Sequence, residues 1–231
     1  MRKVLCSIGV GPHRELLDIS GATFSIFARR HAYDLELRRD SLAADRAPAW
    51  SKIKLLRELL SHYDLALWID ADVAIVDPTL DIAEELGPRD LMGLVAHEYD
   101  GMRVPNSGVW VLRSSRSVRR LLDRIWDRVE YLDHDWWENA ALISELGYTV
   151  EPRVELAKAT RILARTRFVD RSWNSIEIDA APHPRINHYP GRSQEHRLDS
   201  LTRDLVTARA VAAGLEIPAS DPTGSDAPGC D

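Results

Sequence analysis

The sequence contains only two cysteines, Cys6 and Cys230, among 231 residues. Cys6 lies in an apolar, strand-like segment, whereas Cys230 lies in a polar segment close to the end of the chain. Such a pair does not predict a disulfide framework. We expect both thiols to be reduced, as is usual in the cytoplasm.

Long apolar runs and a strong net charge are also missing. No apolar segment approaches the roughly 20 residues that a membrane-spanning helix needs. The opening MRKVLCSIGVGP lacks the apolar core and the small-residue cleavage site of a secretion signal. A formal net charge of −6 argues against a surface that coats a polyanion. We therefore expect a soluble, cytoplasmic protein without nucleic-acid binding or membrane insertion.

The first hundred residues alternate between strand-like and helix-like patterns. Apolar runs typical of buried strands alternate with stretches of helical periodicity, in the order KVLCSIGV, residues 15–30, YDLELRR, residues 50–63 and LALWI. Alternation of strands and helices predicts an α/β layer architecture.

The second half is less regular. Two strand-like segments, DLMGLVAHE and SGVWVLRS, flank an expected loop around YDGMRVPN. Helices are expected at 117–131, 136–146 and 193–213, with short extended segments in ATRILARTRFVD and RINHYPG. Residues 216–231 are rich in Pro, Gly, Ser and Asp and predict a disordered tail. No repeat is visible, so we expect a single domain over residues 1–215.

Two acids interrupt the apolar segment LWIDADVAI, at Asp70 and Asp72. Residues two apart in a strand face the same side. A buried carboxylate is costly unless a cation or hydrogen-bond donors accompany it, and a hard divalent cation such as Mg²⁺ or Mn²⁺ would hold both acids and bind phosphate oxygens. The simpler alternative is a strand that ends in solvent, with Asp72 or Asp77 capping a turn.

The chain resembles a known family in the order of its motifs. These are WSKIKLLREL, YDLALWIDADVAIVDP, NSGVWVLRSS, WWENAAL, RFVDRSWNSI and NHYPG. The order resembles the GT-A glycosyltransferases, above all the galactosyl-, mannosyl- and xylosyltransferase family of the yeast and plant Golgi, and more distantly glycogenin-type enzymes. The resemblance implies an α/β, Rossmann-like fold with a mixed central sheet flanked by helices. Residues 1–100 would bind the nucleotide and 101–215 the acceptor.

The same resemblance implies a metal site. Asp70, Asp72 and His188 would hold a divalent ion on the diphosphate of a nucleotide sugar, and Gly191 would let the backbone approach that diphosphate. Because imidazole suits manganese, this set favours Mn²⁺ over Mg²⁺. The family has a lysine two residues after this glycine, where this chain has Ser193. Arg192 would then take over the phosphate contact.

Two residues near the reacting sugar are implied to be catalytic, Glu138 and Asn139. They would position the donor sugar and stabilise the positive charge that develops on it. Asn139 replaces the family's glutamine. An equally good interpretation of Glu138 is a capping box with Asp135, which would engage its carboxylate in backbone hydrogen bonds.

The remaining residues implied to bind the donor lie at five places along the chain. They are Ile8, Gly9 and Val10 after the first strand, Lys52 on the helix before the acids, Ala71 between the acids, Asn106, Ser107 and Gly108 before a strand, and Trp173 and Asn174 in a loop. Surface exposure of Lys52 and core packing of Trp173 are the ordinary alternatives.

These observations predict a metal-dependent glycosyltransferase that moves a sugar from a nucleotide diphosphate, UDP before GDP, to a small-molecule, peptide or glycan hydroxyl. Retention of configuration is implied by resemblance alone. The first alternative is a haloacid-dehalogenase-like phosphatase, which also uses D-x-D but has Thr or Val at the position of Ala74. The second is a non-catalytic nucleotide-sugar-binding protein, favoured by Asn139 and Ser193.

Overall fold

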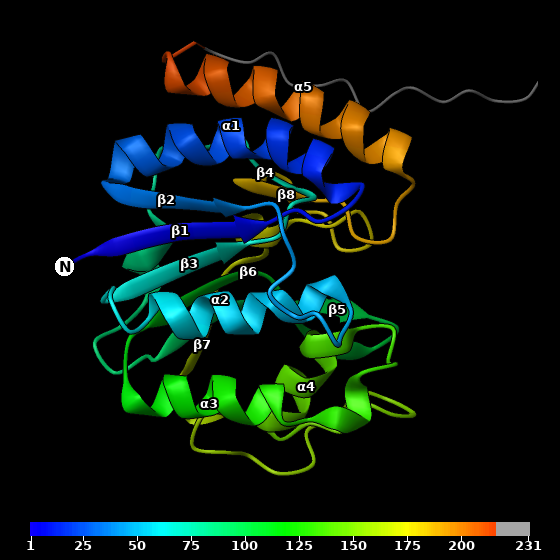
Figure 1. The fold of residues 1–231 in the computed structure, drawn as a ribbon. Helices are drawn as coiled ribbons and strands as arrows, with labels where there is room; N and C mark the ends of the chain where they lie inside the picture. Colours follow the sequence, from blue (N-terminus) through cyan, green and yellow to red (C-terminus); the bar gives the residue numbers. More distant parts are fainter. Residues whose placement is uncertain (216–231) are drawn as a thin grey trace, which may run out of the picture.

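A six-stranded sheet forms the centre of the molecule in the computed structural model, which describes residues 1–215 (Figure 1). The strand order is β2-β1-β3-β6-β5-β7. The strands are β1 (Lys3–Ile8), β2 (Tyr33–Arg38), β3 (Leu65–Ile69), β5 (Met92–Tyr99), β6 (Met102–Arg113) and β7 (Thr166–Phe168). The predicted tail at 216–231 lies outside the described residues.

The sheet is mixed. Strand β1 pairs in parallel with β2 and β3, and β5 pairs in parallel with β7. Strand β6 runs antiparallel to both of its neighbours, β3 and β5. The predicted α/β class with a mixed central sheet is therefore confirmed.

Helices cover both faces of this sheet (Figure 1). On one face α1 (His13–His31) lies against the sheet, and α5 (Gln194–Ala212) packs over α1. The other face carries α2 (Ser51–Leu59), α3 (Arg116–Trp126) and α4 (Trp137–Leu146). Neighbouring residues of a strand point to opposite faces, which explains the long apolar runs: Val4 and Cys6 pack in the α2–α3 layer, and Leu5 packs against α1.

A glycine allows α1 to begin directly after β1. A Cβ at Gly9 would lie 2.4 Å from the His13 carbonyl oxygen and 2.8 Å from the Leu17 Cβ. The backbone at Gly9 is therefore approached closely by α1 of the same chain.

The expected loop around YDGMRVPN is wrong. Strands β5 and β6 continue through most of it as a hairpin, paired from Met102 opposite Tyr99 onward. Only Asp100 and Gly101 form the turn, both with positive φ. Strand pairing gives hydrogen-bond partners to the backbone NH and carbonyl groups of this segment. This stabilisation outweighs the turn preference of its Asp, Gly, Pro and Asn residues. The helices expected at residues 50–63 and 117–131 are shorter than predicted, because α2 ends at Leu59 and α3 ends at Trp126.

A second, two-stranded sheet joins distant parts of the chain. Strand β4 (Val73–Ile75) follows the acids directly and pairs antiparallel with β8 (Ile186–His188). Val73 lies opposite His188 in this pairing, so the histidine is brought to the acids by backbone hydrogen bonding. No helix in residues 1–215 combines the length and apolar character needed to cross a bilayer.

Candidate functional site

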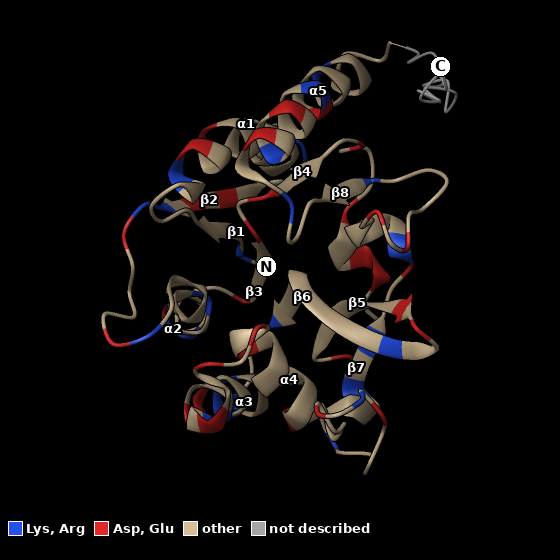
Figure 2. Cartoon of the chain, turned by 90° about the vertical axis from the view of Figure 1, so that its right-hand side faces the viewer, with Lys and Arg blue, Asp and Glu red and all other residues tan. Residues whose placement is uncertain are grey.

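A cavity of about 950 Å³ opens where β1 and β3 end. Figure 2 looks onto this edge of the sheet, between the α1–α5 layer and the α2–α3–α4 layer. The residues that line the cavity include Asp70, Asp72, His188, Lys52 and Glu138. The carboxyl end of a parallel strand is the usual position of a ligand crevice in α/β folds.

Three potential metal ligands converge in this cavity. Asp70 follows β3, Asp72 precedes β4, and His188 ends β8. One ligand atom from each residue lies within 4.8 Å of the others. The structure therefore brings together the three residues that the sequence had selected.

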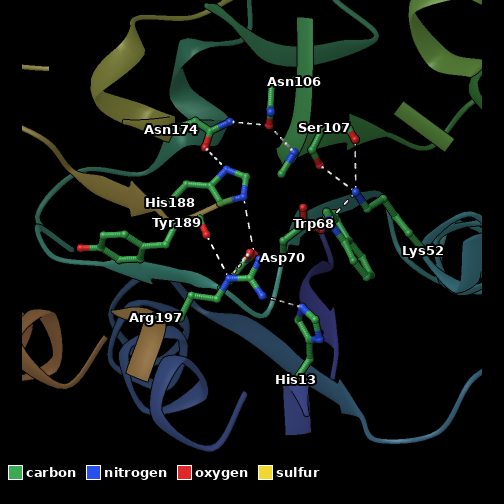
Figure 3. Close-up of polar contacts among 12 residues, drawn as sticks. His13, Lys52, Trp68, Asp70, Asn106, Ser107, Asn174, His188, Tyr189 and Arg197 are labelled. Atoms are coloured by element: carbon green, nitrogen blue, oxygen red, sulfur yellow. Dashed lines mark hydrogen bonds and ion pairs between the residues drawn. The ribbon is translucent and has the colours of Figure 1, made fainter. Parts of the chain in front are cut away.

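A relay of amides fixes the orientation of the His188 ring (Figure 3). Asn106 Oδ1 accepts hydrogen bonds from the Gly108 backbone NH at 2.7 Å and from Asn174 Nδ2 at 2.9 Å. Asn174 therefore turns its Oδ1 to His188 Nδ1, at 2.9 Å. Because an amide oxygen only accepts, Nδ1 carries a proton, and Nε2 is left to share a proton or a cation with a neighbouring carboxylate.

Asp72 faces that nitrogen. Its Oδ1 lies 3.5 Å from His188 Nε2, and its Oδ2 lies 3.5 Å from Arg197 Nε. Burial alone would raise the pKa of Asp72, but His188, Arg197 and His13 together lower the pKa to about 2. The carboxylate is therefore ionised at neutral pH.

This arrangement fits a divalent cation. A carboxylate and an imidazole lone pair repel each other unless a proton or an ion lies between them. His188 is buried, and the relay behind it is the support that metal-binding histidines commonly have. Two carboxylates and one imidazole form a donor set that suits first-row divalent metals.

Lys52 occupies the centre of a second cluster beside Asp70. Its Nζ lies 2.7 Å from Glu138 Oε1, 3.0 Å from Asp70 Oδ1 and 3.1 Å from Ser107 Oγ. Burial would lower the pKa of Lys52, but Asp70 and Glu138 raise it above its ordinary value. Lys52 is thus a buried cation and not a surface lysine of an amphipathic helix.

Glu138 serves this cluster rather than the end of its helix. The residue before α4 is Trp136, no side chain caps the helix, and the capping box with Asp135 does not form. Burial raises the pKa of Glu138, with a further contribution from Asp70, although Lys52 opposes the shift. Oε2 of Glu138 is buried and has no hydrogen-bond partner among the described residues. Asn139 lies on α4 and is held against β6, because its Oδ1 accepts a hydrogen bond from the Ser107 NH.

Gly108 leaves room for the histidine. A Cβ at this position would lie 2.3 Å from His188 Cε1 and 2.7 Å from His188 Nδ1. Any other residue here would displace the ring, so the glycine is required by close packing.

The other selected residues divide into two groups. Ile8, Val10, Ala71, Asn106, Ser107, Asn139 and Gly191 line the cavity. Gly9, Trp173, Asn174 and Arg192 do not. Trp173 is buried in the core and donates its indole NH to Glu85, whereas Arg192 forms an ion pair with Glu177.

Sequence reasoning missed several cavity residues, among them the polar side chains Arg197, His13 and His97. Arg197 projects from α5 and also donates to the Tyr189 carbonyl oxygen at 3.1 Å. On an amphipathic helix this arginine looks like any surface cation, so the sequence carried no signal for it. His97 lies in an apolar strand, where a lone histidine is a weak signal of function.

No protein-family model and no curated protein sequence matches the chain. Solved structures match it in fold. A glycosyltransferase involved in the glycosylation of the major capsid of PBCV-1 has a TM-score of 0.67 and 14% identity, covering 88% of this chain and 100% of that one. The galactosyltransferase LgtC, in complex with donor and acceptor sugar analogues, has a TM-score of 0.58 and 12% identity, covering 93% of this chain and 97% of that one.

A third match is the glycosyltransferase GlyE of Streptococcus pneumoniae, with a TM-score of 0.56 and 13% identity, covering 94% of this chain and 66% of that one. At such identities the similarity establishes the fold. The chain has the α/β fold of GT-A glycosyltransferases, with a candidate divalent-metal site at Asp70, Asp72 and His188.

Proposed function

We propose that the protein is a metal-dependent glycosyltransferase that moves a sugar from a nucleotide diphosphate to a hydroxyl acceptor. UDP-sugar is the favoured donor and Mn²⁺ the favoured ion, with GDP and Mg²⁺ next. The single observation that carries this proposal is the convergence of Asp70, Asp72 and an oriented His188 within 4.8 Å, in a cavity of a GT-A fold.

In this proposal the three ligands hold the ion through carboxylate oxygens and His188 Nε2. A bound divalent ion would act as a Lewis acid and template for the diphosphate. Residues 1–100 would bind the nucleotide, with Ile8 and Val10 beside the base and ribose. Residues 101–215 would bind the acceptor.

The charges around the cavity support an anionic donor. Asp70, Asp72 and Glu138 are opposed by Lys52 and Arg197, so a divalent ion would leave a net positive site that favours a diphosphate. Arg192 is engaged by Glu177, and Arg197 lines the cavity in its place. We assign the phosphate contact to Arg197.

Glu138 and Asn139 are proposed to act on the donor sugar. Glu138 offers the unpaired Oε2 to a sugar hydroxyl or to the charge that develops at the anomeric carbon. Asn139 positions the Ser107 backbone beside Lys52. Retention of configuration, with attack from the leaving-group side, requires no side-chain base in this arrangement.

A thermal-shift panel tests this function. Nucleotides and nucleotide sugars are added with and without Mn²⁺, since a ligand that binds only the folded state raises the melting temperature. We expect a rise with UDP-sugar and Mn²⁺ together that Asp72→Asn abolishes and that Asp18→Asn, an exposed control, retains. A shift without metal, or none with any nucleotide, would overturn the proposal.

A further inference from the structure

Exposed aromatic side chains gather at the mouth of the cavity. Within residues 1–215 the Phe, Tyr and Trp side chains that are more than a third exposed are Tyr99, Trp136 and Trp137, which are 45%, 37% and 42% exposed. All three line the cavity, as does Ile178. A cluster of exposed aromatic rings at one opening indicates a ligand with an apolar face.

One polar group on the cavity wall has an unused hydrogen-bonding atom. His97 is only 3% exposed, and its Nδ1 lies 3.3 Å from Asp179 Oδ2. Its other ring nitrogen, Nε2, is buried and has no partner among the described residues. A buried polar atom without a partner is costly, and a ligand can supply that partner.

The surroundings of Asp179 determine which His97 nitrogen carries the proton. Asp179 accepts hydrogen bonds from Arg171 at 2.6 Å and from the Glu98 NH at 3.2 Å. Although burial opposes ionisation, these donors lower the pKa of Asp179, so the carboxylate stays charged and can only accept. Burial lowers the pKa of His97, which keeps the ring neutral. Nδ1 is therefore the donor, and Nε2 is a hydrogen-bond acceptor.

His97 lies a short distance from the metal-ligand cluster along the hairpin. It pairs with Val104 of β6, and Asn106, which starts the relay to His188, lies two residues further along the same strand. Residues two apart in a strand are separated by about 7 Å and share a face. His97 therefore lies beside the metal cluster, toward the aromatic rim.

We propose that the acceptor is a sugar residue or glycoside that binds in this part of the cavity. One of its hydroxyl groups donates a hydrogen bond to His97 Nε2, and the apolar face of its ring packs on the rim formed by Tyr99, Trp136 and Trp137. This inference rests on the proposed glycosyltransferase function and names the acceptor class. His97 binds and positions the acceptor, and no proton transfer is assigned to it.

The test separates transfer from hydrolysis of the donor. UDP-glucose and UDP-galactose are incubated with Mn²⁺ and a panel of p-nitrophenyl and octyl glycosides. The glycosylated product and the free sugar released to water are both quantified. We expect His97→Phe to raise the acceptor KM and to lower the ratio of transfer to hydrolysis about tenfold, the loss typical of one hydrogen bond. His97→Gln, which keeps an acceptor atom, retains most of that ratio, and His62→Phe is the matched control outside the cavity.

The aromatic rim is tested by a second pair of variants. Trp136→Ala should lower the ratio of transfer to hydrolysis, and Trp136→Phe should restore it, with Leu80→Ala as a control at an exposed apolar site. This pair carries the test if His97→Phe unfolds. Failure to bind or hydrolyse either donor would overturn the proposed function itself. Hydrolysis with no glycoside accepted, or equal losses of transfer and hydrolysis in His97→Phe and Trp136→Ala, would overturn the acceptor assignment alone.

Discussion

The two acids of the D-x-D motif lie two residues apart but have different surroundings. Asp70 accepts from the Trp68 indole NH at 2.6 Å and forms an ion pair with Lys52 at 3.0 Å. Asp72 faces Nε2 of His188 and the Arg197 side chain, each at 3.5 Å. One oxygen of the first carboxylate, Oδ1, is thus engaged within the protein, whereas the contacts of the second carboxylate are too long for strong hydrogen bonds.

This difference distinguishes charges that are paired within the protein from charges that are available to a ligand. Lys52, Asp70 and Glu138 form a cluster closed by its own ion pairs, which connects α2, the end of β3 and α4. Asp72 and His188 instead form an open pair that a divalent cation would complete. We expect the loss of Lys52, the cation of the first cluster, to lower stability, and variants of the second pair to lower ligand affinity.

The largest expected effect is on the open pair. Asp72→Asn replaces a charged ligand with a neutral amide, and we expect Mn²⁺ affinity to fall at least about 100-fold, with a loss of turnover. Free Mn²⁺ measured by electron paramagnetic resonance gives the affinity directly. Asp18→Asn on exposed α1 surface should bind as the wild type does. Unchanged binding in Asp72→Asn would show that the ion is held elsewhere.

The closed cluster should respond in stability. Lys52→Met leaves Asp70 and Glu138 without their cation, and breaking a buried ion pair in this way costs about 3–5 kcal/mol. Urea unfolding measures the change. Lys54→Met, on the same helix, removes only an exposed cation near the Trp126 ring and should cost less than about 1 kcal/mol. A similar small loss for both lysines would remove the distinction between the two acids.

The relay behind His188 should have an intermediate effect. Asn174→Ala frees the imidazole to rotate or to change tautomer, and the expected fall in Mn²⁺ affinity is about 10- to 100-fold. Asn187→Ala is the matched control, because that amide donates to Asp204 instead. Calorimetric titration of both variants gives the comparison. Equal affinities would mean that the ring does not depend on the relay.

The smallest expected effect is on the pH dependence of stability without metal. The folded-state pKa of Asp72 is about 2, below its ordinary value of 3.8, so its contribution is present above about pH 4 and is lost as the pH falls toward 2. The pKa of Glu138 is raised, so protonation of Glu138 at falling pH stabilises the fold.

Urea unfolding from pH 7 to 2 in EDTA checks these opposite signs. In Asp72→Asn, the decrease in the free energy of unfolding at low pH should be smaller than in the wild type, by about 2 kcal/mol or less. Glu138→Gln should change the slope in the opposite direction. Slopes of the same sign in both variants would contradict the contrast between the two clusters.

Much of the fold was predictable because the central strands β1 and β3 are buried on both faces. Leu65–Ile69 is wholly buried, and such runs stand out in a sequence. The β5–β6 hairpin was missed because the residues near its tip favour a turn. Its conformation is decided by pairing between the two strands, which a local sequence pattern does not show.

The site was predictable where a motif carries the residue and not where only the folded chain brings the residue into the cavity. The D-x-D pair and His188 were selected from resemblance, and β4–β8 pairing explains why they meet. Arg197 and His97 carry no motif, so only the folded arrangement identifies them. Conversely, Trp173 was selected as a donor-binding residue but packs in the hydrophobic core, which was the ordinary alternative for a tryptophan.

The most direct measurement is the anomalous diffraction of crystals grown with Mn²⁺ and UDP. The metal-site account predicts one manganese peak at about 2 Å from Asp70, Asp72 and His188 Nε2, with the diphosphate bound to the same ion. A manganese peak remote from His188, or ordered UDP without any ion between these residues, would contradict it.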